Sequence, residues 1–144
     1  MPYHPMDEAE LREFLRSPVR TATVATTRRD GRPHVAPVWY DLDDDGAILF
    51  NTGADTVKGR AIRRTGKVAL CVQDDQPPFA FVCIDGDAAW TDELPEVRRW
   101  AARIGGRYMG ADRAEEYGAR NGVPGELLVR VTPTRVVGEA ELAD

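Results

Sequence analysis

Segments with β-strand character follow one another along this chain without a helix after every strand. Each is short, rich in β-branched or apolar residues, and bounded by turn-forming residues. The predicted strands are 21–27, 34–42, 47–50, 67–73, 79–90, 126–131 and 134–137, and the predicted helices are 8–16, 56–65, 95–108 and 112–120. This order favours a mainly β, α+β fold with an antiparallel sheet and peripheral helices over a doubly wound parallel sheet. Six or seven short strands most economically close into a barrel, because closure removes exposed edges.

Length and composition indicate one ordinary globular domain over residues 1–144. Hydrophobic residues make up 42% of the chain and charged residues 30%, which is typical of a protein with a packed core. The net charge of −5 argues against a nucleic-acid or anionic-membrane binder. Apolar runs such as 79–84 are far shorter than the ~20 residues of a membrane span, and residues 1–5 do not resemble an export signal. We therefore expect a cytoplasmic protein.

The two cysteines, Cys71 and Cys83, have no metal-ligand spacing. A hairpin over 67–90 would place them opposite each other, so that a disulfide is sterically possible. Two buried thiols are the favoured interpretation in a cytoplasmic protein. No metal site is predicted.

The segment 51–64 has the composition of an anion-binding helix start. Asp55 is the predicted N-cap, and Lys58 and Arg60 follow it in the first turn, where acidic residues are normally preferred. Free backbone amides, the hydroxyls of Thr52 and Thr56 and the two cations would together hold a phosphate. The alternative, to which we give equal weight, is a solvated basic helix face.

The segment 32–40 is a strand interrupted by Pro33 and Pro37. Because proline cannot donate to a ladder, the segment indicates an edge, a bulge or an unpaired stretch whose amides are open to a ligand. Trp39 or Tyr40 would then close an apolar wall against a planar ring. His34 is a candidate proton donor, although a lone histidine on a strand is more often structural, and the aromatic residues equally fit a core.

Several segments together resemble a known family. They are 33–39, 58–64, 77–82 leading to 85–88, 121–129 and 133–136. In order and spacing they are similar to the pyridoxamine 5′-phosphate oxidase-like split-barrel superfamily, and more narrowly to its branch of reductases that depend on the deazaflavin coenzyme F420. The resemblance covers nearly the whole chain, although no single motif is specific.

The resemblance implies a homodimer of six-stranded split barrels with the cofactor between the subunits. The cofactor ring would lie along 35–39, the phosphate would be held by Thr52, Thr56 and Lys58, and residues 76–79 would reach the cofactor across the interface. The candidate cofactor-binding residues are Val35, Ala36, Pro37, Val38, Trp39, Asn51, Thr52, Thr56, Val57, Lys58, Arg60, Gln76, Pro78 and Phe79.

Two departures weaken a vitamin-B6 oxidase interpretation. FMN-dependent oxidases of the family typically carry arginine immediately before the phosphate lysine, where this chain has Val57. The arginine-rich C-terminal segment with which such oxidases hold pyridoxal phosphate does not precede Asp144. FMN remains open as a ligand.

The leading functional hypothesis is hydride transfer from reduced F420 to an electron-poor acceptor such as an activated alkene, a quinone or a tetrapyrrole. No residue is identified as a dedicated acid or base; His34 and Tyr40 are weak candidates. Tyr108, Met109 and Tyr117, on helices that would cover the cleft, are candidate substrate contacts, with core packing favoured for each. The alternatives are an FMN-dependent oxidase or reductase, a non-catalytic carrier of F420, FMN or haem, and a barrel without a cofactor.

Overall fold

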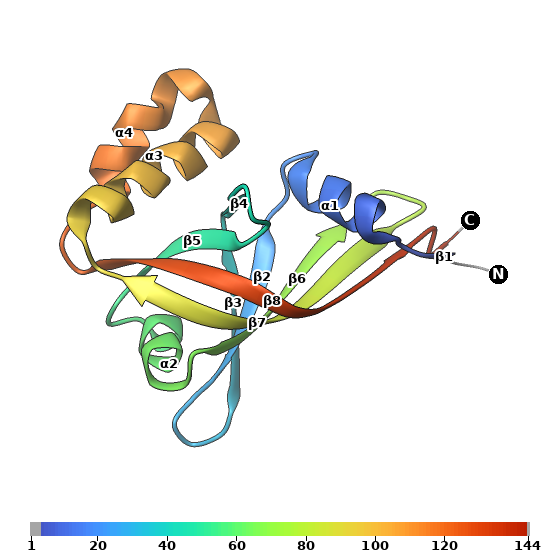
Figure 1. Ribbon diagram of the computed structural model, residues 1–144, viewed down its shortest axis with the longest axis horizontal. Coiled ribbons are helices and arrows are strands. Elements are labelled where there is room, and N and C mark those ends of the chain that lie inside the picture. The colour runs from blue at the N-terminus through green and yellow to red at the C-terminus, as the bar shows by residue number, and fades with distance from the viewer. Residues whose placement is uncertain (1–3, 144) are drawn as a thin grey trace.

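The computed structural model describes residues 4–143 and shows one strongly curled antiparallel sheet with helices at its ends (Figure 1). The strand order is β3-β2-β6-β7-β8-β5-β4, and β1 pairs with β8 outside this path. The strands are β1 (His4–Pro5), β2 (Ala22–Thr27), β3 (Pro33–Val38), β4 (Asp41–Leu42), β5 (Ile48–Gly53), β6 (Lys67–Asp74), β7 (Ala80–Thr91) and β8 (Glu126–Ala140). The α+β split barrel is confirmed, with 8 strands in place of the expected six. Residues 1–3 and 144 of the predicted single domain lie outside the described residues.

The different strand number has local causes. The predicted strand 34–42 divides at Trp39 into β3 and β4, and a two-residue β1 is added beside β8. The two predicted C-terminal strands are instead one strand, β8, because Pro133 is accommodated at a register shift opposite Asp85 and Gly86. There the Thr134 hydroxyl donates to the Asp85 carbonyl oxygen at 3.1 Å, where proline cannot donate to the ladder.

The two ends of the sheet are joined by two residues of the chain. β3 is one end of the strand path and β4 is the other, and only Trp39 and Tyr40 separate them in sequence. The prolines of β3 therefore lie on an edge strand, as predicted. The chain itself bridges the open side of the curled sheet.

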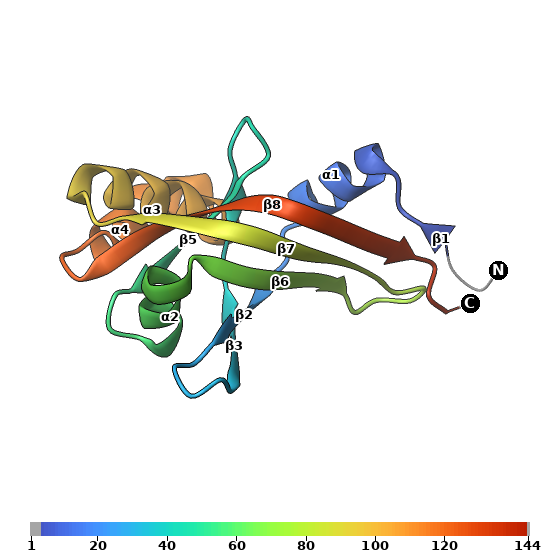
Figure 2. The ribbon, with the colours of Figure 1, turned by 60° about the horizontal axis from the view of Figure 1, so that its bottom comes forward.

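Four helices flank the sheet: α1 (Glu8–Arg16), α2 (Val57–Thr65), α3 (Leu94–Met109) and α4 (Ala114–Asn121). α3 and α4 pack against each other at one end of the sheet, α1 lies near the other end, and α2 lies beside the β2–β3 hairpin (Figures 1 and 2). All four lie near their predicted positions. None of the helices between residues 4 and 143 is long and apolar enough to cross a membrane.

Two predicted helix caps were wrong. Thr56, rather than Asp55, caps α2, and its hydroxyl accepts a hydrogen bond from the Gly59 amide at 3.1 Å. The capping box predicted at Asp112 and Glu115 does not form, because 111–113 make a 3₁₀ turn that leaves Arg113 at the N-cap of α4 without a side-chain cap.

The inner face of the sheet carries the main core, with fully buried Val24, Phe50, Val82 and Val129. A second cluster lies under α3 and consists of Ala47, Leu49, Val97, Trp100 and Leu128.

The outer face carries the two cysteines. Cys71 and Cys83 are directly opposed in the β6–β7 ladder, as predicted, and both are free thiols. The expectation that both are buried was wrong, because Cys71 is only partly buried and Cys83 is exposed on this face. Burial raises the pKa of Cys71 to about 11.

Candidate functional site

A small open pocket brings together parts of the two segments singled out from the sequence. It lies between the barrel and the α3–α4 pair and measures about 230 Å³. We call it the Lys58 pocket; it is lined by Pro37, Val38, Trp39, Asn51, Lys58, Ile104 and Asn121. The strand around Trp39 and the first turn of α2 therefore meet at one site.

Trp39 forms a fixed aromatic wall of this pocket. Its ring stacks on Tyr108 of α3, with ring centroids 4.8 Å apart and planes at 5°, and Tyr117 of α4 lies at 5.9 Å. The Tyr108 hydroxyl donates to the Arg20 carbonyl oxygen at 2.7 Å and accepts from the Tyr40 amide at 3.1 Å. Tyr108 and Tyr117, considered above as substrate contacts, thus support Trp39, which itself stays 36% exposed.

Lys58 brings a half-buried ammonium group to the pocket. No carboxylate of residues 4–143 forms an ion pair with it. Burial lowers the pKa of Lys58, and the more distant Glu126 carboxylate partly offsets this. Burial also raises the pKa of Glu126, whose Oε2 is buried without a hydrogen-bond partner among the described residues. Lys58 therefore has no ion-pair partner among the described residues, although the Glu126 carboxylate acts on its charge from farther away.

The loop beneath Lys58 is braced by its own hydroxyls. The Thr52 and Thr56 hydroxyl oxygens are 3.2 Å apart, and Thr56 also donates to the Gly53 carbonyl oxygen at 2.7 Å. A Cβ on Gly59 would lie 2.1 Å from that carbonyl oxygen, so the close approach of loop and helix requires glycine. Both hydroxyls, predicted as phosphate donors, are engaged within the loop and fix the position of α2.

A family model described as pyridoxamine 5′-phosphate oxidase matches residues 7–138 of the chain. The chain belongs to this family. The family match and the split barrel confirm the resemblance drawn from the sequence. No curated protein matches the chain significantly.

Solved structures with the same fold include proteins named for different cofactors. A conserved hypothetical protein of Mycobacterium tuberculosis is 29% identical, with a TM-score of 0.78 over 91% of this chain and 82% of that one. An F420 reductase is 23% identical, with a TM-score of 0.64 over 81% of this chain and 88% of that one. A FAD-binding protein of Mesorhizobium loti is 16% identical, with a TM-score of 0.71 over 96% of this chain and 98% of that one. The last two likenesses show the fold alone.

Several candidate residues of this family member lie outside the Lys58 pocket. Val57 and Arg60 line a different, arginine-rich pocket on another face of α2, so Lys58 and Arg60 do not share one phosphate site within the chain. Gln76, Pro78 and Phe79 lie in the β6–β7 turn, at the opposite end of the long sheet from α3 and α4 (Figure 2).

The strand β3 presents its residues to two faces. Val35 is 63% exposed on the outer face, whereas His34 and Ala36 alternate with it and are partly buried. His34 is paired across the ladder with Thr26, and its Nδ1 is buried without a partner among the described residues. His34 therefore lies away from the pocket.

Tyr40 belongs to the core. Its side chain is fully buried, and its hydroxyl donates to the Leu15 carbonyl oxygen at 2.7 Å. Burial raises the pKa of Tyr40 to about 12. Neither Tyr40 nor His34 is placed to exchange a proton in the Lys58 pocket.

Three residues near the site were not singled out from the sequence. The sequence placed Ile104 on the core-facing side of its predicted helix. Asn121 was assigned as a helix stop and as the start of a segment that resembles the family, without a role in the site. Glu126, opposite Gly53 in the β5–β8 ladder, is close enough to Lys58 to influence its charge. Only the strand register reveals this proximity.

The pocket can bind an anion and a polar ring edge together. Lys58 supplies the positive charge, and the carboxamides of Asn51 and Asn121 can donate to or accept from carbonyl oxygens and ring nitrogens. Trp39 and Ile104 supply apolar contact. A phosphorylated heteroaromatic molecule has this combination of groups.

Proposed function

We propose that this protein is a reductase that uses F420 and transfers a hydride to an electron-poor acceptor such as an activated alkene, a quinone or a tetrapyrrole. The supporting observation is the Lys58 pocket, in which an unpaired ammonium group lies beside an aromatic wall and two carboxamides. Membership of an oxidase family and the likeness to an F420 reductase support redox chemistry at this site.

The charge of the pocket favours F420 over FMN. Val57 stands where FMN oxidases typically carry an arginine, and Lys58 is the one cation that lines this pocket within the described chain. A single lysine holds a phosphate more weakly than a bidentate arginine does, and this weaker contact suits F420 better than FMN. The family name and the FAD-binding neighbour support an FMN-dependent enzyme as the second candidate.

We also propose that two copies of the chain complete the site. A volume of about 230 Å³ is below the roughly 300–1,000 Å³ of ligand pockets. The outer face of the sheet exposes Val35 and Val137, at 63% and 39%, and these apolar side chains suit burial against a second copy. The partner would then bring residues 76–79 of its own β6–β7 turn to the cofactor. A cytoplasmic location remains a prediction.

The chain's own residues would bind and orient the cofactor. When bound, the deazaflavin or flavin ring supplies the hydride chemistry. Lys58 would hold the phosphate, Asn51 and Asn121 would hydrogen-bond the ring edge, and Trp39 would exclude water from one side. Because His34 and Tyr40 lie off the pocket, we propose that the proton that follows the hydride comes from solvent.

The test is a fluorescence titration of the protein with F420 and, separately, with FMN. Lys58→Ala is expected to weaken binding about 10- to 100-fold, because a partly buried charge-assisted contact is lost. Lys67→Ala is the matched control, since Lys67 is the only other lysine and pairs with Asp87 on the surface. It should bind like the unmodified protein.

The outcomes separate the alternatives. Tighter binding of FMN than of F420 would assign the protein to the flavin-dependent branch. Tight binding without turnover of any alkene, quinone or tetrapyrrole acceptor would indicate a carrier. Binding of neither compound would leave only the family and the fold.

A further inference from the structure

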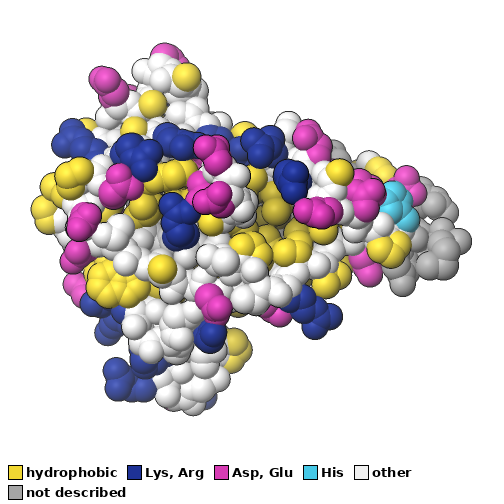
Figure 3. All heavy atoms as spheres, in the orientation of Figure 1, with side chains coloured by type: hydrophobic (Ala, Val, Ile, Leu, Met, Phe, Trp, Pro, Cys, Tyr) yellow, Lys and Arg dark blue, Asp and Glu magenta, His cyan; other side chains and the backbone are white. Residues whose placement is uncertain are grey.

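A further pocket lies between α1, the β4–β5 turn and β8. It measures about 500 Å³, which is within the roughly 300–1,000 Å³ of ligand pockets. We call it the α1 pocket; its apolar lining consists of Leu11, Leu15, Leu42, Ile84, Pro133 and Val136. Near the centre of Figure 3, hydrophobic side chains form the floor of a hollow with charged side chains at its edge. The α1 pocket shares no lining residue with the Lys58 pocket.

The sheet and α1 hold the walls of the α1 pocket in place. Ile84 and Pro133 lie beside the register shift of the β7–β8 ladder, where the proline has no amide to donate. At the end of α1, the Leu15 carbonyl oxygen accepts from the Tyr40 hydroxyl at 2.7 Å and from the Arg107 guanidinium at 3.1 Å. The apolar lining is therefore preformed, so a ligand need not reorganise the chain in order to bind.

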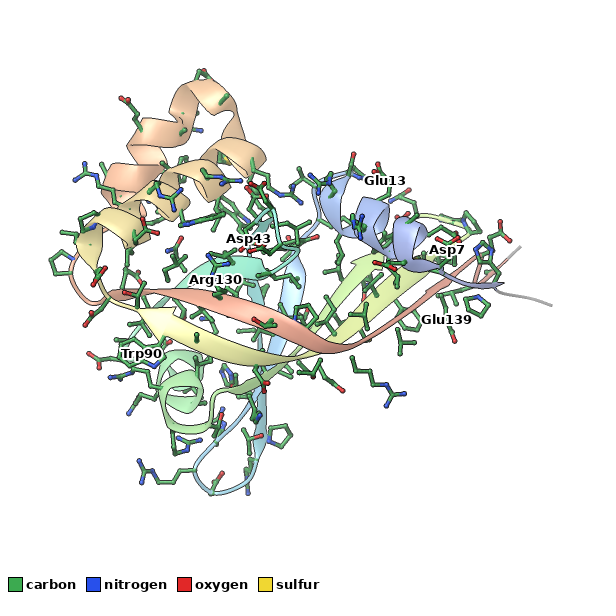
Figure 4. The ribbon with its side chains drawn as sticks, viewed as in Figure 1. Asp7, Glu13, Asp43, Trp90, Arg130 and Glu139 are labelled. Carbon is green, nitrogen blue, oxygen red and sulfur yellow. The ribbon has the colours of Figure 1, made fainter. Side chains whose placement is uncertain are left out.

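The β4–β5 turn brings carboxylates to one side of the α1 pocket. Asp43 is already engaged, because its carboxylate accepts from the Asp45 and Ala47 amides at 2.9 Å each and pairs with Arg130, toward which it points (Figure 4). Asp44 and Asp45 are exposed at the rim, and their carboxylates form no ion pair with any of residues 4–143. Two negative charges are therefore available beside an apolar surface.

The α1 side of the rim contributes less free charge. Glu8 and Arg12 neutralise each other in an ion pair at 3.0 Å. Arg16 is then the one unpaired cation of the lining, within the part of the chain that the structure describes. It lies in the last turn of α1, where the partial negative charge of the helix end stabilises a cation. The uncompensated charge of the pocket is therefore negative.

A negative rim beside an apolar surface determines which ligand chemistry fits. We infer that the α1 pocket binds a cationic amphiphile, a small molecule in which a protonated amine is joined to an apolar body. The apolar body would cover the leucines and Val136, and the amine would lie beside Asp44 and Asp45. Burial of the apolar body supplies most of the affinity, because exposed carboxylates contribute little each, and the carboxylates select the sign of the head group. Binding at this pocket does not depend on the proposed reductase activity.

The test compares three probes with the same hydrocarbon chain and different head groups: octylammonium, octanol and octanoate. NMR titration measures their binding at about neutral pH and about 0.15 M ionic strength, at concentrations where the probes do not aggregate. Octylammonium is expected to bind about 3- to 10-fold more tightly than octanol, and octanoate more weakly than octanol, because the head group meets two exposed carboxylates.

The double variant Asp44→Asn/Asp45→Asn tests the rim. It is expected to bind octylammonium about 3- to 10-fold more weakly and octanol with unchanged affinity. Neither carboxylate has a partner in the described structure, so the fold should persist, and circular dichroism checks this. Asp92→Asn/Glu93→Gln is the matched control, because these consecutive acidic residues are exposed and do not line the pocket. It should keep the octylammonium affinity within about twofold.

Val136→Phe tests the apolar floor. The larger ring would occupy the pocket, so both octylammonium and octanol should bind about tenfold more weakly, whatever their charge. Lys58→Ala should bind octylammonium like the unmodified protein, since Lys58 lines a separate pocket. If Val136→Phe does not fold, the comparison of the two acidic double variants decides.

Four results would overturn the inference. The first is an octylammonium affinity no higher than that of octanol. The second is an equal loss in the two acidic double variants, which would indicate a general effect of net charge. The third is tighter binding of octanoate than of octylammonium, which would assign the pocket to an acyl carboxylate held by Arg16. The fourth is unchanged octylammonium binding by a folded Val136→Phe variant.

Discussion

The two sides of the Lys58 pocket differ in how their polar groups are satisfied. On the Trp39 side, the Tyr40 and Tyr108 hydroxyls and the Tyr40 amide all have hydrogen-bond partners within the chain. On the α2 side, Lys58 has no ion-pair partner among the described residues. This difference indicates that the hydrogen bonds of the Trp39 side stabilise the fold, whereas the charge of Lys58 is left available to bind a ligand.

The largest effect is expected where the Trp39 side is most tightly packed. A Cβ on Gly105 of α3 would lie 2.2 Å from the Tyr117 Cβ, so Gly105→Ala must separate α3 from α4. We expect a loss of about 2–3 kcal/mol in the free energy of unfolding, measured by urea denaturation. Gly106→Ala is the control, because its Cβ would meet Ala114 at 3.1 Å and needs only a small adjustment. An equal loss in both variants would show that helix–helix packing is not the cause.

Removal of one buried hydroxyl should cost less. Tyr40→Phe loses the hydrogen bond to the Leu15 carbonyl oxygen, which still accepts from Arg107 at 3.1 Å. We expect the variant to lose about 1–2 kcal/mol of stability and to keep its cofactor affinity. Tyr117→Phe should be close to neutral, since no described partner bonds its hydroxyl. Weaker cofactor binding by Tyr40→Phe would contradict the assignment of Tyr40 to stability alone.

The charge of Lys58, on the α2 side, should make the cofactor affinity depend on pH. Burial holds the pKa of Lys58 below its ordinary value of 10.5. Cofactor affinity should therefore fall as pH rises through this lowered pKa, by up to about tenfold per pH unit. The stability of the ligand-free protein should change in the opposite sense, because the unfolded chain binds more protons in this window and the cost of burying the ammonium disappears as it deprotonates. Titrations of Lys58→Arg, which stays charged, should give a flatter affinity profile.

The smallest expected effect concerns Glu126. Its carboxylate interacts with Lys58 without forming an ion pair, so it opposes an incoming phosphate. Glu126→Gln should raise the affinity for the phosphorylated cofactor by about two- to fivefold. Glu139→Gln, at the far end of β8 (Figure 4), should leave the affinity unchanged. A weaker cofactor complex in Glu126→Gln would mean that the carboxylate helps to hold the ligand.

Local patterns predicted most of the fold correctly. The strand and helix positions followed from β-branched runs, turn residues and helical spacing, and the opposition of Cys71 and Cys83 followed from the hairpin. The caps were less predictable, because Asp55 and Thr56 are both good N-caps and the difference depends on which one reaches the Gly59 amide. The strand number depended on two-residue pairings such as β4 and β1, which have no sequence pattern of their own.

The site was predicted in part. Trp39 and Lys58 do meet, as the proline-interrupted strand and the basic helix start suggested. Arg60 was grouped with Lys58 because the two are close in sequence, but a helix turns about 100° per residue and places them on different faces. The contribution of Asn121 and Glu126 depends on long-range packing, which spacing along the chain does not encode.

Trp39 and Tyr40 are consecutive residues, although one faces the pocket and the other fills the core. The residue that forms the pocket wall therefore also belongs to the two-residue segment that connects the two ends of the sheet. A mutant library designed to widen acceptor range should keep positions 39 and 40 constant. It should place its diversity at Ile104 of α3 instead, which lines the pocket without belonging to the sheet.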